Sequence, residues 1–185
     1  MSLQQSTAQT FGPYFAIGLK RVEVGIPADA AQVKLIIRGR VIDGDGKPVG
    51  DAAVETWQAN LQGRYPAPSP TGAVPAHADL TGLGRAPTDA EGRFEIHTYK
   101  PGPVPGAGGA LQAPHILVAV GMRGLLRHLV TRMYFPDEAS NARDAVLQLV
   151  PAERRATLVA KAAGKNELSW DVALQGDNET VFFDC

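Results

Sequence analysis

The side chain with the clearest potential for metal chemistry is that of His115, which stands in the apolar run 113–120. The run is rich in β-branched residues and follows a Gly/Pro-rich loop, so it predicts a buried β-strand. Because side chains alternate along a strand, the residue that shares a face with His115 stands two positions further on. A metal site on this strand would need a second imidazole there, and the chain has Leu117. The pattern therefore indicates the frame of a metal site without a working set of ligands.

The other histidines do not supply the missing donor in an obvious way. His77 stands in a predicted loop, His97 in a predicted strand and His128 at the start of another, and these positions suggest no shared face. A lone histidine on a strand is more often a structural residue than a ligand. We interpret His115 in that way, and a substitute metal site built from the other histidines stays open.

Three arginines follow the central strand and could bind an anion. Arg123 and Arg127 stand in the connection 122–127, where an arginine is usually a solvated loop charge. A guanidinium in an enclosed site can instead hold a carboxylate through charge-assisted hydrogen bonds. Arg132 lies inside the next predicted strand, and we expect it to pair with an acidic residue at the domain surface.

The N-terminal segment 1–32 shows little periodicity and reads as an arm. Gly12 and Pro13 predict a turn, and Phe11 and Tyr14 flank it. An aromatic arm of this kind either packs on its own domain or crosses to a partner, and the residues alone leave both interpretations open. We predict an arm over 1–32, followed by a domain over 33–185.

The elements that must position these side chains are mostly short strands. Turn signals rich in Asp, Gly and Pro separate apolar or alternating runs. The predicted strands cover 33–42, 52–59, 93–99, 113–120, 128–135, 168–174 and 179–183. The first two are expected to form a hairpin across the turn 43–48, and 60–92 reads as a long irregular segment.

Helical signals are few and lie late in the chain. Residues 136–144 read as a short helical or loop segment, and 151–160 as the best helix, with proline at its start and Gly164 beyond its end. About eight short strands with one short helix near the C-terminus predict an all-β fold, an antiparallel β-sandwich.

Composition excludes several classes of function. The chain has 185 residues, 18 basic and 19 acidic residues and a formal net charge of −1, without a basic block, so we expect no nucleic-acid partner. No apolar run approaches the ~20 residues that span a bilayer, and no secretory signal is evident, so we expect no membrane partner. The only cysteine is Cys185, which excludes an internal disulfide and favours the reducing cytoplasm.

At this point the motifs resemble a known family, the intradiol ring-cleaving dioxygenases. The resemblance runs from Thr10 to Phe183, and the order and spacing of the motifs are too specific for a chance match. The motifs that carry it are residues 55–59 followed by 60–65, then 100–103, 114–116 and 131–135.

The resemblance implies a set of four positions for iron ligands. Catalytic members bind Fe(III) through two tyrosines and two histidines, because phenolates suit ferric iron and imidazoles complete its shell. In this chain those positions hold Tyr65, Val104, His115 and Leu117. We call them the four ligand positions. Since valine and leucine coordinate nothing, the chain is expected to hold no iron and no catalytic residue of its own.

The resemblance also implies a role for this chain beside a partner. It is similar to the non-catalytic, α-type subunits, which form hetero-oligomers with a homologous β subunit that holds Fe(III). The resemblance thus implies that the N-terminal arm 1–32 contacts a partner subunit. The implied substrates are O2 and protocatechuate, a catechol that bears a carboxylate. The implied substrate-binding residues of this chain are Thr10, Gly12, Pro13, Tyr14 and Arg123, and for Thr10 simple subunit packing is nearly as good an interpretation.

An alternative from another class stays open at this stage. The chain could be a transthyretin-like binding or assembly module, without enzymatic activity, that forms its own homo-oligomer. The two hypotheses differ in whether a ferric partner subunit is needed for function.

Overall fold

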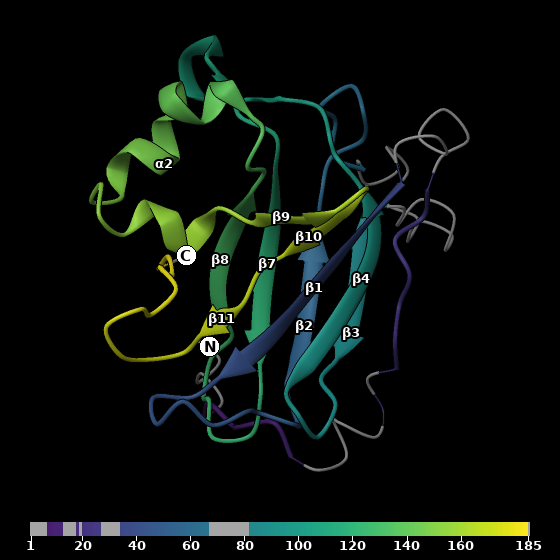
Figure 1. The fold of residues 1–185 in the computed structure, drawn as a ribbon, viewed down its shortest axis with the longest axis vertical. Coiled ribbons are helices and arrows are strands. Elements are labelled where there is room, and N and C mark those ends of the chain that lie inside the picture. The colour runs from purple at the N-terminus through teal and green to yellow at the C-terminus, as the bar shows by residue number, and fades with distance from the viewer. Residues whose placement is uncertain (1–6, 13–17, 19, 27–33, 67–81, 185) are drawn as a thin grey trace, which may run out of the picture.

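The computed structural model describes residues 7–12, 18, 20–26, 34–66 and 82–184, and two β-sheets packed face to face form the centre of the molecule (Figure 1). The first sheet has the order β11-β1-β10-β9, with β4 also paired to β1. Its strands are β1 (Lys34–Ile42), β4 (Arg93–Tyr99), β9 (Lys161–Gly164), β10 (Glu167–Ser169) and β11 (Val172–Ala173).

The second sheet has the order β3-β2-β7-β8. Its strands are β2 (Ala53–Trp57), β3 (Leu83–Pro87), β7 (His115–Gly121) and β8 (Leu129–Tyr134). A separate hairpin joins β5 (Val104–Pro105) to β6 (Leu111–Gln112). All the strand pairs are antiparallel except those of β1 with β10 and β11, among the residues that the structure describes.

The core lies between the two sheets because each contributes one apolar face. Ile37 and Val41 of β1 meet Val118 and Val120 of β7 in this layer, all of them buried. Gly39 lies between the first two on β1, where the backbone of Trp170 crosses closely. A Cβ atom on Gly39 would lie 1.8 Å from the Trp170 carbonyl oxygen, so only glycine fits there.

A second, smaller core lies beside β8, where the helical segments pack (Figure 1). The segments that pack here are η4 (Ala139–Arg143), α2 (Ala145–Leu149) and η5 (Arg155–Leu158), of which α2 is an α-helix and the other two are 3₁₀ helices, while a further 3₁₀ turn, η3 (Ala107–Gly109), lies between β5 and β6. Asp144 caps α2 by accepting a hydrogen bond from the Leu147 N–H at 2.8 Å. Leu147 then packs with Leu158 and Tyr134, which fixes the helical segment to the sheet.

The all-β sandwich that the sequence predicts is confirmed, with several local corrections. The strands predicted at 33–42 and 52–59 form but do not pair as a hairpin, since β1 and β2 belong to different sheets. The turn itself forms, because the Asp43 carboxylate accepts hydrogen bonds from the Asp45 and Lys47 N–H groups. It joins Ile42 to Pro48 only by an isolated bridge.

Three further predictions are wrong in detail. The segment 60–92 is not irregular throughout, because it contains β3. The helix predicted over 151–160 is replaced by turns and the short 3₁₀ helix η5, and the α-helix of the region is α2. Residues 179–183 form no strand and contribute one isolated bridge, between Val130 and Phe183.

Residues 20–26 of the N-terminal segment pack on the sandwich. Val22 forms a β-bridge with Arg85, with hydrogen bonds of 2.9 and 2.8 Å, and so covers the outer edge of β3. Val24 is buried in the main core. The proposed division at residues 32 and 33 stays a prediction, although this part of the arm already lies on the domain.

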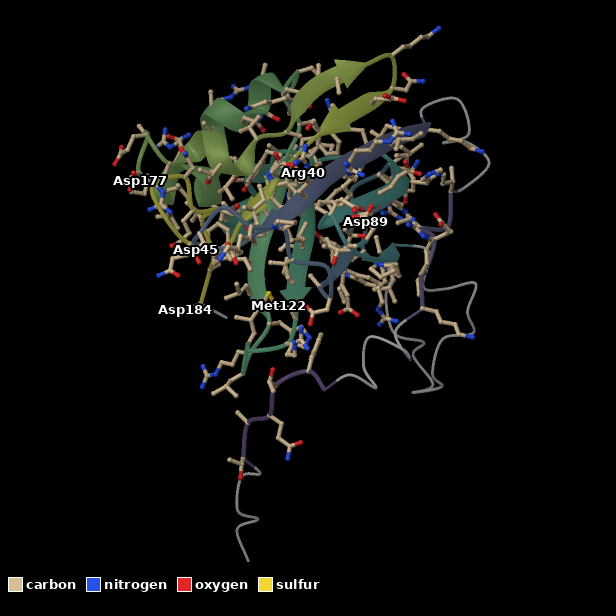
Figure 2. The ribbon with its side chains drawn as sticks, turned by 60° about the horizontal axis from the view of Figure 1, so that its bottom comes forward. Arg40, Asp45, Asp89, Met122, Asp177 and Asp184 are labelled. Carbon is tan, nitrogen blue, oxygen red and sulfur yellow. The ribbon has the colours of Figure 1, made fainter. Side chains whose placement is uncertain are left out.

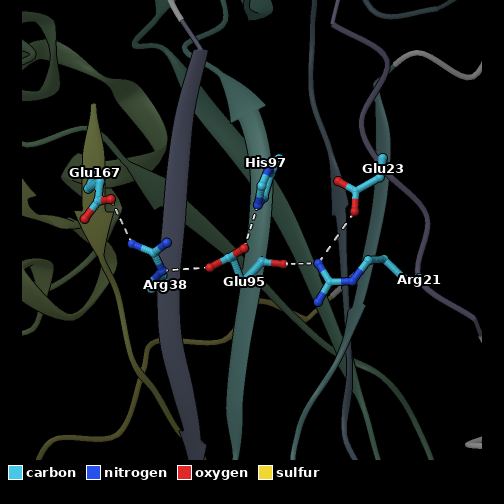
Figure 3. A network of polar contacts seen from close by, with 6 residues as sticks. All are labelled: Arg21, Glu23, Arg38, Glu95, His97 and Glu167. Carbon is cyan, nitrogen blue, oxygen red and sulfur yellow. Dashed lines mark hydrogen bonds and ion pairs between the residues drawn. The ribbon is translucent and has the colours of Figure 1, made fainter. Parts of the chain in front are cut away.

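The outward face of the first sheet carries an ion-pair network (Figure 3). Arg38 bonds Glu95 at 2.7 Å and Glu167 at 2.9 Å, and His97 lies 2.6 Å from the other Glu95 oxygen. Arg21 donates to the Glu95 carbonyl oxygen at 2.7 Å. The hydrogen bonds from His97 and Arg38 lower the pKa of the Glu95 carboxyl.

Replacing Glu95 with glutamine should slightly reduce the loss of stability that the protein shows as the pH falls through the acidic range. A carboxyl with a lowered pKa contributes stability above its ordinary pKa of 4.5, and that contribution is lost as the pH falls through the lowered value. The network is solvent-exposed, so salt should weaken the effect. Unfolding midpoints of both proteins between pH 3 and pH 7 check this, and equal slopes below about pH 4.5 would count against it.

Candidate functional site

Two of the four ligand positions come together in space and touch. Tyr65 follows the loop 60–64, and His115 is the first residue of β7, 50 positions later in the chain. The Tyr65 hydroxyl lies 3.3 Å from the His115 Nε2 atom. The loop is held in place by the hydrogen bond from the Gly102 N–H to the Asn60 carbonyl oxygen.

The hydrogen bonds of His115 define its protonation state. Its Nδ1 atom lies 2.7 Å from the Ala113 carbonyl oxygen, which can only accept, so Nδ1 carries the proton. Nε2 therefore carries no proton and accepts a hydrogen bond from the Tyr65 hydroxyl. Burial lowers the pKa of His115 and raises the pKa of Tyr65, so both rings are kept neutral and the pair is a neutral hydrogen bond.

The other two ligand positions offer no donor atom. Val104 is buried in β5, opposite Gln112. Leu117 lies in β7 between Trp57 of β2 and Arg132 of β8. The described part of the chain also contains no group of three or more His, Cys, Asp or Glu residues that could hold a metal ion. A tyrosine and a histidine beside two aliphatic side chains do not fit ferric iron.

The remaining histidines do not complete the site. His97 lies on the outward face of the first sheet, in contact with Glu95. His128 follows the β7–β8 connection, where its ring packs edge-on against Phe11 with centroids 5.1 Å apart. His97 therefore lies in the other sheet from His115, and His128 lies beside Gly121 at the opposite end of β7 from His115, while His77 lies outside the described residues.

Arg132 occupies a different environment from the one expected. Its Nη1 atom donates to the Gln112 side-chain oxygen at 2.7 Å, and it has no acidic partner among the described residues. The guanidinium is only partly exposed and lies in the row of residues that contains Leu117. The prediction of a surface ion pair was wrong because strand alternation gives the face of a residue and not its neighbours.

The N-terminal arm meets the β7–β8 connection close to Arg123. The Thr10 hydroxyl accepts a hydrogen bond of 2.6 Å from the Gly124 N–H. Phe11 lies over Gly121, where an added Cβ would stand 2.3 Å from the ring. The structure thus brings Thr10, Gly12 and Arg123 into one region, while Pro13 and Tyr14 lie outside the described residues.

Arg123 presents its charge at the end of the second sheet. Its side chain is 76% exposed, and its Nε atom bonds the Asp51 carboxylate at 3.0 Å. Met122, the residue before it, lies at the end of the sandwich that the purple N-terminal segment approaches (Figure 2). No local sequence pattern selects Asp51, because its partner Arg123 is distant in the chain.

Replacing Gly121 with alanine should release the arm without unfolding the sandwich. The new methyl group overlaps the end of the Phe11 ring, which is a side chain that can move away. Limited proteolysis should then cut the variant within residues 7–12 at least about ten times faster than the parent, while the unfolding midpoint stays within a few degrees. Equal cleavage rates would show that Phe11 does not anchor the arm.

The chain as a whole matches a known class of protein. The family model described as a dioxygenase matches residues 20–176, and the chain belongs to this family, the intradiol dioxygenases. Enzymes of this family are iron-dependent.

The similar proteins include alpha and beta chains of one enzyme of this family. The protocatechuate 3,4-dioxygenase alpha chain of Burkholderia cepacia is 45% identical over 203 aligned residues, with 99% of this chain and 98% of that protein covered. The alpha chain of Pseudomonas putida is 38% identical, with 98% of this chain and 97% of that protein covered. The beta chain of Burkholderia cepacia is 37% identical over 69% of this chain and 55% of its own length.

Solved structures agree on the fold. The dioxygenase domain of a fusion protein from Streptomyces sp. SirexAA-E has a TM-score of 0.61 at 24% identity, covering 96% of this chain and 97% of that one. The 3-chlorocatechol 1,2-dioxygenase of Rhodococcus opacus 1CP has a TM-score of 0.64 at 23% identity, covering 82% of this chain and 63% of that one.

Proposed function

We propose that this chain is the alpha, non-iron-binding subunit of protocatechuate 3,4-dioxygenase. In that enzyme protocatechuate is cleaved with O2 to β-carboxy-cis,cis-muconate in aromatic catabolism. The observation that carries the proposal is the pair of aliphatic residues, Val104 and Leu117, at ligand positions in a chain that is 45% identical to an alpha chain over nearly its whole length. The chain is thus part of an enzyme and is not catalytic alone.

The partner in this proposal is a homologous beta subunit that holds Fe(III). The similarity of this chain to a beta chain supports a shared fold for the two subunits. When bound there, the ferric iron supplies the activation of the catechol toward O2. The present chain contributes pocket shape and charge, and its only cysteine, Cys185, fits a cytoplasmic enzyme.

In this proposal the substrate-binding residues of the chain are Thr10, Gly12, Pro13, Tyr14 and Arg123. Arg123 is exposed at the end of the sheet and can meet the protocatechuate carboxylate with charge-assisted hydrogen bonds. Thr10 holds the arm against the Gly124 N–H, so the arm and the Arg123 loop would enter the pocket together. Gly12 has open space where a Cβ would stand, and a glycine there lets the backbone approach a flat ring.

The alternative, a non-enzymatic transthyretin-like module, is not favoured by the relatives. In the described part of the chain, no helix has the length and hydrophobicity needed to cross a membrane.

A direct experiment on the proposed function compares this chain, a beta-type subunit and the two expressed together. The proposal predicts one co-eluting complex and ring cleavage of protocatechuate only with both chains. A stable homo-oligomer that ignores the beta-type subunit supports the alternative.

A further inference from the structure

The guanidinium of Arg132 lies among the four ligand positions, a placement that the proposed function does not explain. We propose that Arg132 supplies a fixed positive charge where catalytic members hold the metal, and that this charge keeps a metal cation out of the site. The inference rests on the proposed function, because it concerns how an iron-free subunit stays iron-free.

The strand register places Arg132 next to the ligand positions on two sides. In the β7–β8 ladder Arg132 stands directly opposite Leu117, so the two side chains share a face. Its guanidinium reaches along this face to the side chain of Gln112 at 2.7 Å. Gln112 is paired with Val104 in the β5–β6 hairpin, so the charge lies beside the positions of both missing ligands.

The same charge acts on the two ligand positions that keep polar side chains. The positive charge of Arg132 lowers the pKa of Tyr65 and the pKa of His115, although for both residues burial has the larger effect. Tyr65 and His115 are hydrogen-bonded to each other, so the positive charge of the Arg132 guanidinium acts on both side chains. Arg132 is therefore a neighbour of all four ligand positions.

The charge is also left largely uncompensated. The guanidinium bonds the neutral side-chain amide of Gln112 and also interacts with the neutral Tyr134 hydroxyl, and it forms no ion pair with the described acidic residues. Two carboxylates lie near this part of the sheet, and both have other partners. Glu55 is paired with Arg85 at 2.6 Å, and Asp144 accepts hydrogen bonds from the Tyr134 hydroxyl and from the Ala113 and Leu147 N–H groups. An arginine cannot lose its proton in a protein, so it repels an incoming metal cation at every pH.

Metal binding to engineered variants of the full-length chain tests this inference. The first pair restores all four donors with Val104→Tyr and Leu117→His, once with Arg132 kept and once with Arg132→Gln added. Glutamine retains an amide donor toward Gln112 and removes the charge. After loading with Fe(III), the variant without the charge should bind iron at least about tenfold more tightly. Bound iron per chain and the visible absorption of iron–tyrosinate are the measurements.

A second pair of variants changes fewer core residues than the first. Leu117→His alone adds one imidazole two residues after His115, on the same face and near Tyr65. Isothermal titration with Zn²⁺ should show at least about tenfold tighter binding when Arg132→Gln is added. This pair decides the question if the variants with Val104→Tyr do not fold, as judged by circular dichroism.

Two controls separate charge from shape. Arg132→Lys in the same backgrounds keeps the positive charge and should keep metal affinity low. Arg127→Gln removes an exposed charge from the β7–β8 connection and should leave the metal affinity unchanged. Equal affinities with and without the Arg132 charge, in folded variants, overturn the inference. Tight iron binding by the unmodified chain contradicts the proposed function itself, so the two failures are distinguishable.

Discussion

Replacing Arg123 with alanine is expected to raise the KM for protocatechuate roughly 10- to 100-fold in the reconstituted two-subunit enzyme, with a much smaller change in kcat. A charge-assisted bond from the guanidinium to the substrate carboxylate would be made in the ground state and in the transition state alike. Its loss therefore weakens binding more than turnover. Steady-state kinetics over a range of substrate concentrations measure both constants.

Two matched variants and a second substrate make this prediction specific. Catechol lacks the carboxylate, so its KM should be nearly unaffected by Arg123→Ala. Arg127→Ala removes a neighbouring exposed charge and should leave both substrates unaffected. Asp51→Asn frees Arg123 from its ion pair at 3.0 Å and should lower the KM for protocatechuate a few-fold. Equal losses for both substrates in Arg123→Ala would mean that Arg123 has a structural role only.

The second large effect is a loss of stability, which we expect when Asp144 is replaced. The Asp144 side chain is fully buried. Its carboxylate accepts hydrogen bonds from the Ala113 N–H at 2.8 Å, the Tyr134 hydroxyl at 3.0 Å and the Leu147 N–H at 2.8 Å. Asp144→Ala removes a helix cap and leaves buried donors unpaired, which should cost about 3 kcal/mol or more of unfolding free energy.

Chemical denaturation measures this cost, and two variants calibrate it. Asp144→Asn keeps one acceptor oxygen and should lose less. Asp137→Ala removes a carboxylate that is 73% exposed and should cost well under 1 kcal/mol. A loss below about 1 kcal/mol for Asp144→Ala would show that water or a shifted side chain replaces these bonds. Because Ala113 precedes His115 by two residues, the variant should also disturb the hydrogen bond between Tyr65 and His115.

Strands with strong local signals could be predicted from the sequence. β1, β4 and β7 are alternating or apolar runs bounded by turn residues, and they form close to the expected bounds. β3 could not be found in this way, because its sequence Leu-Gly-Arg-Ala-Pro contains glycine and proline. Its pairing with β2 and the bridge to Val22 make it a strand, and both contacts are distant in the chain.

Helix signals were misleading for a similar reason. Pro151 marked a helix start, but the segment after it forms turns and η5, and the α-helix begins earlier at the Asp144 cap. Asp144 is selected by its contacts with Ala113 and Tyr134, which no local pattern contains. Tertiary contacts thus decided where this part of the chain became helical.

Contacts between distant segments were also what the sequence could not predict in the candidate site. The missing imidazole at Leu117 follows from strand alternation alone, whereas the place of Tyr65 beside His115 depended on the resemblance to a family. The bond of Arg132 to Gln112 and the pairing of Asp51 with Arg123 join distant segments, and spacing gave no sign of either.

The most direct test of the central claim is the metal content of the isolated full-length chain. The purified chain is incubated with Fe(III), excess metal is removed, and bound iron and visible absorption are recorded beside the two-subunit complex. Val104 and Leu117 at two ligand positions predict less than one iron per ten chains and no iron–tyrosinate band, while the complex is coloured. One iron per isolated chain, with that band and with turnover of a catechol, would contradict it.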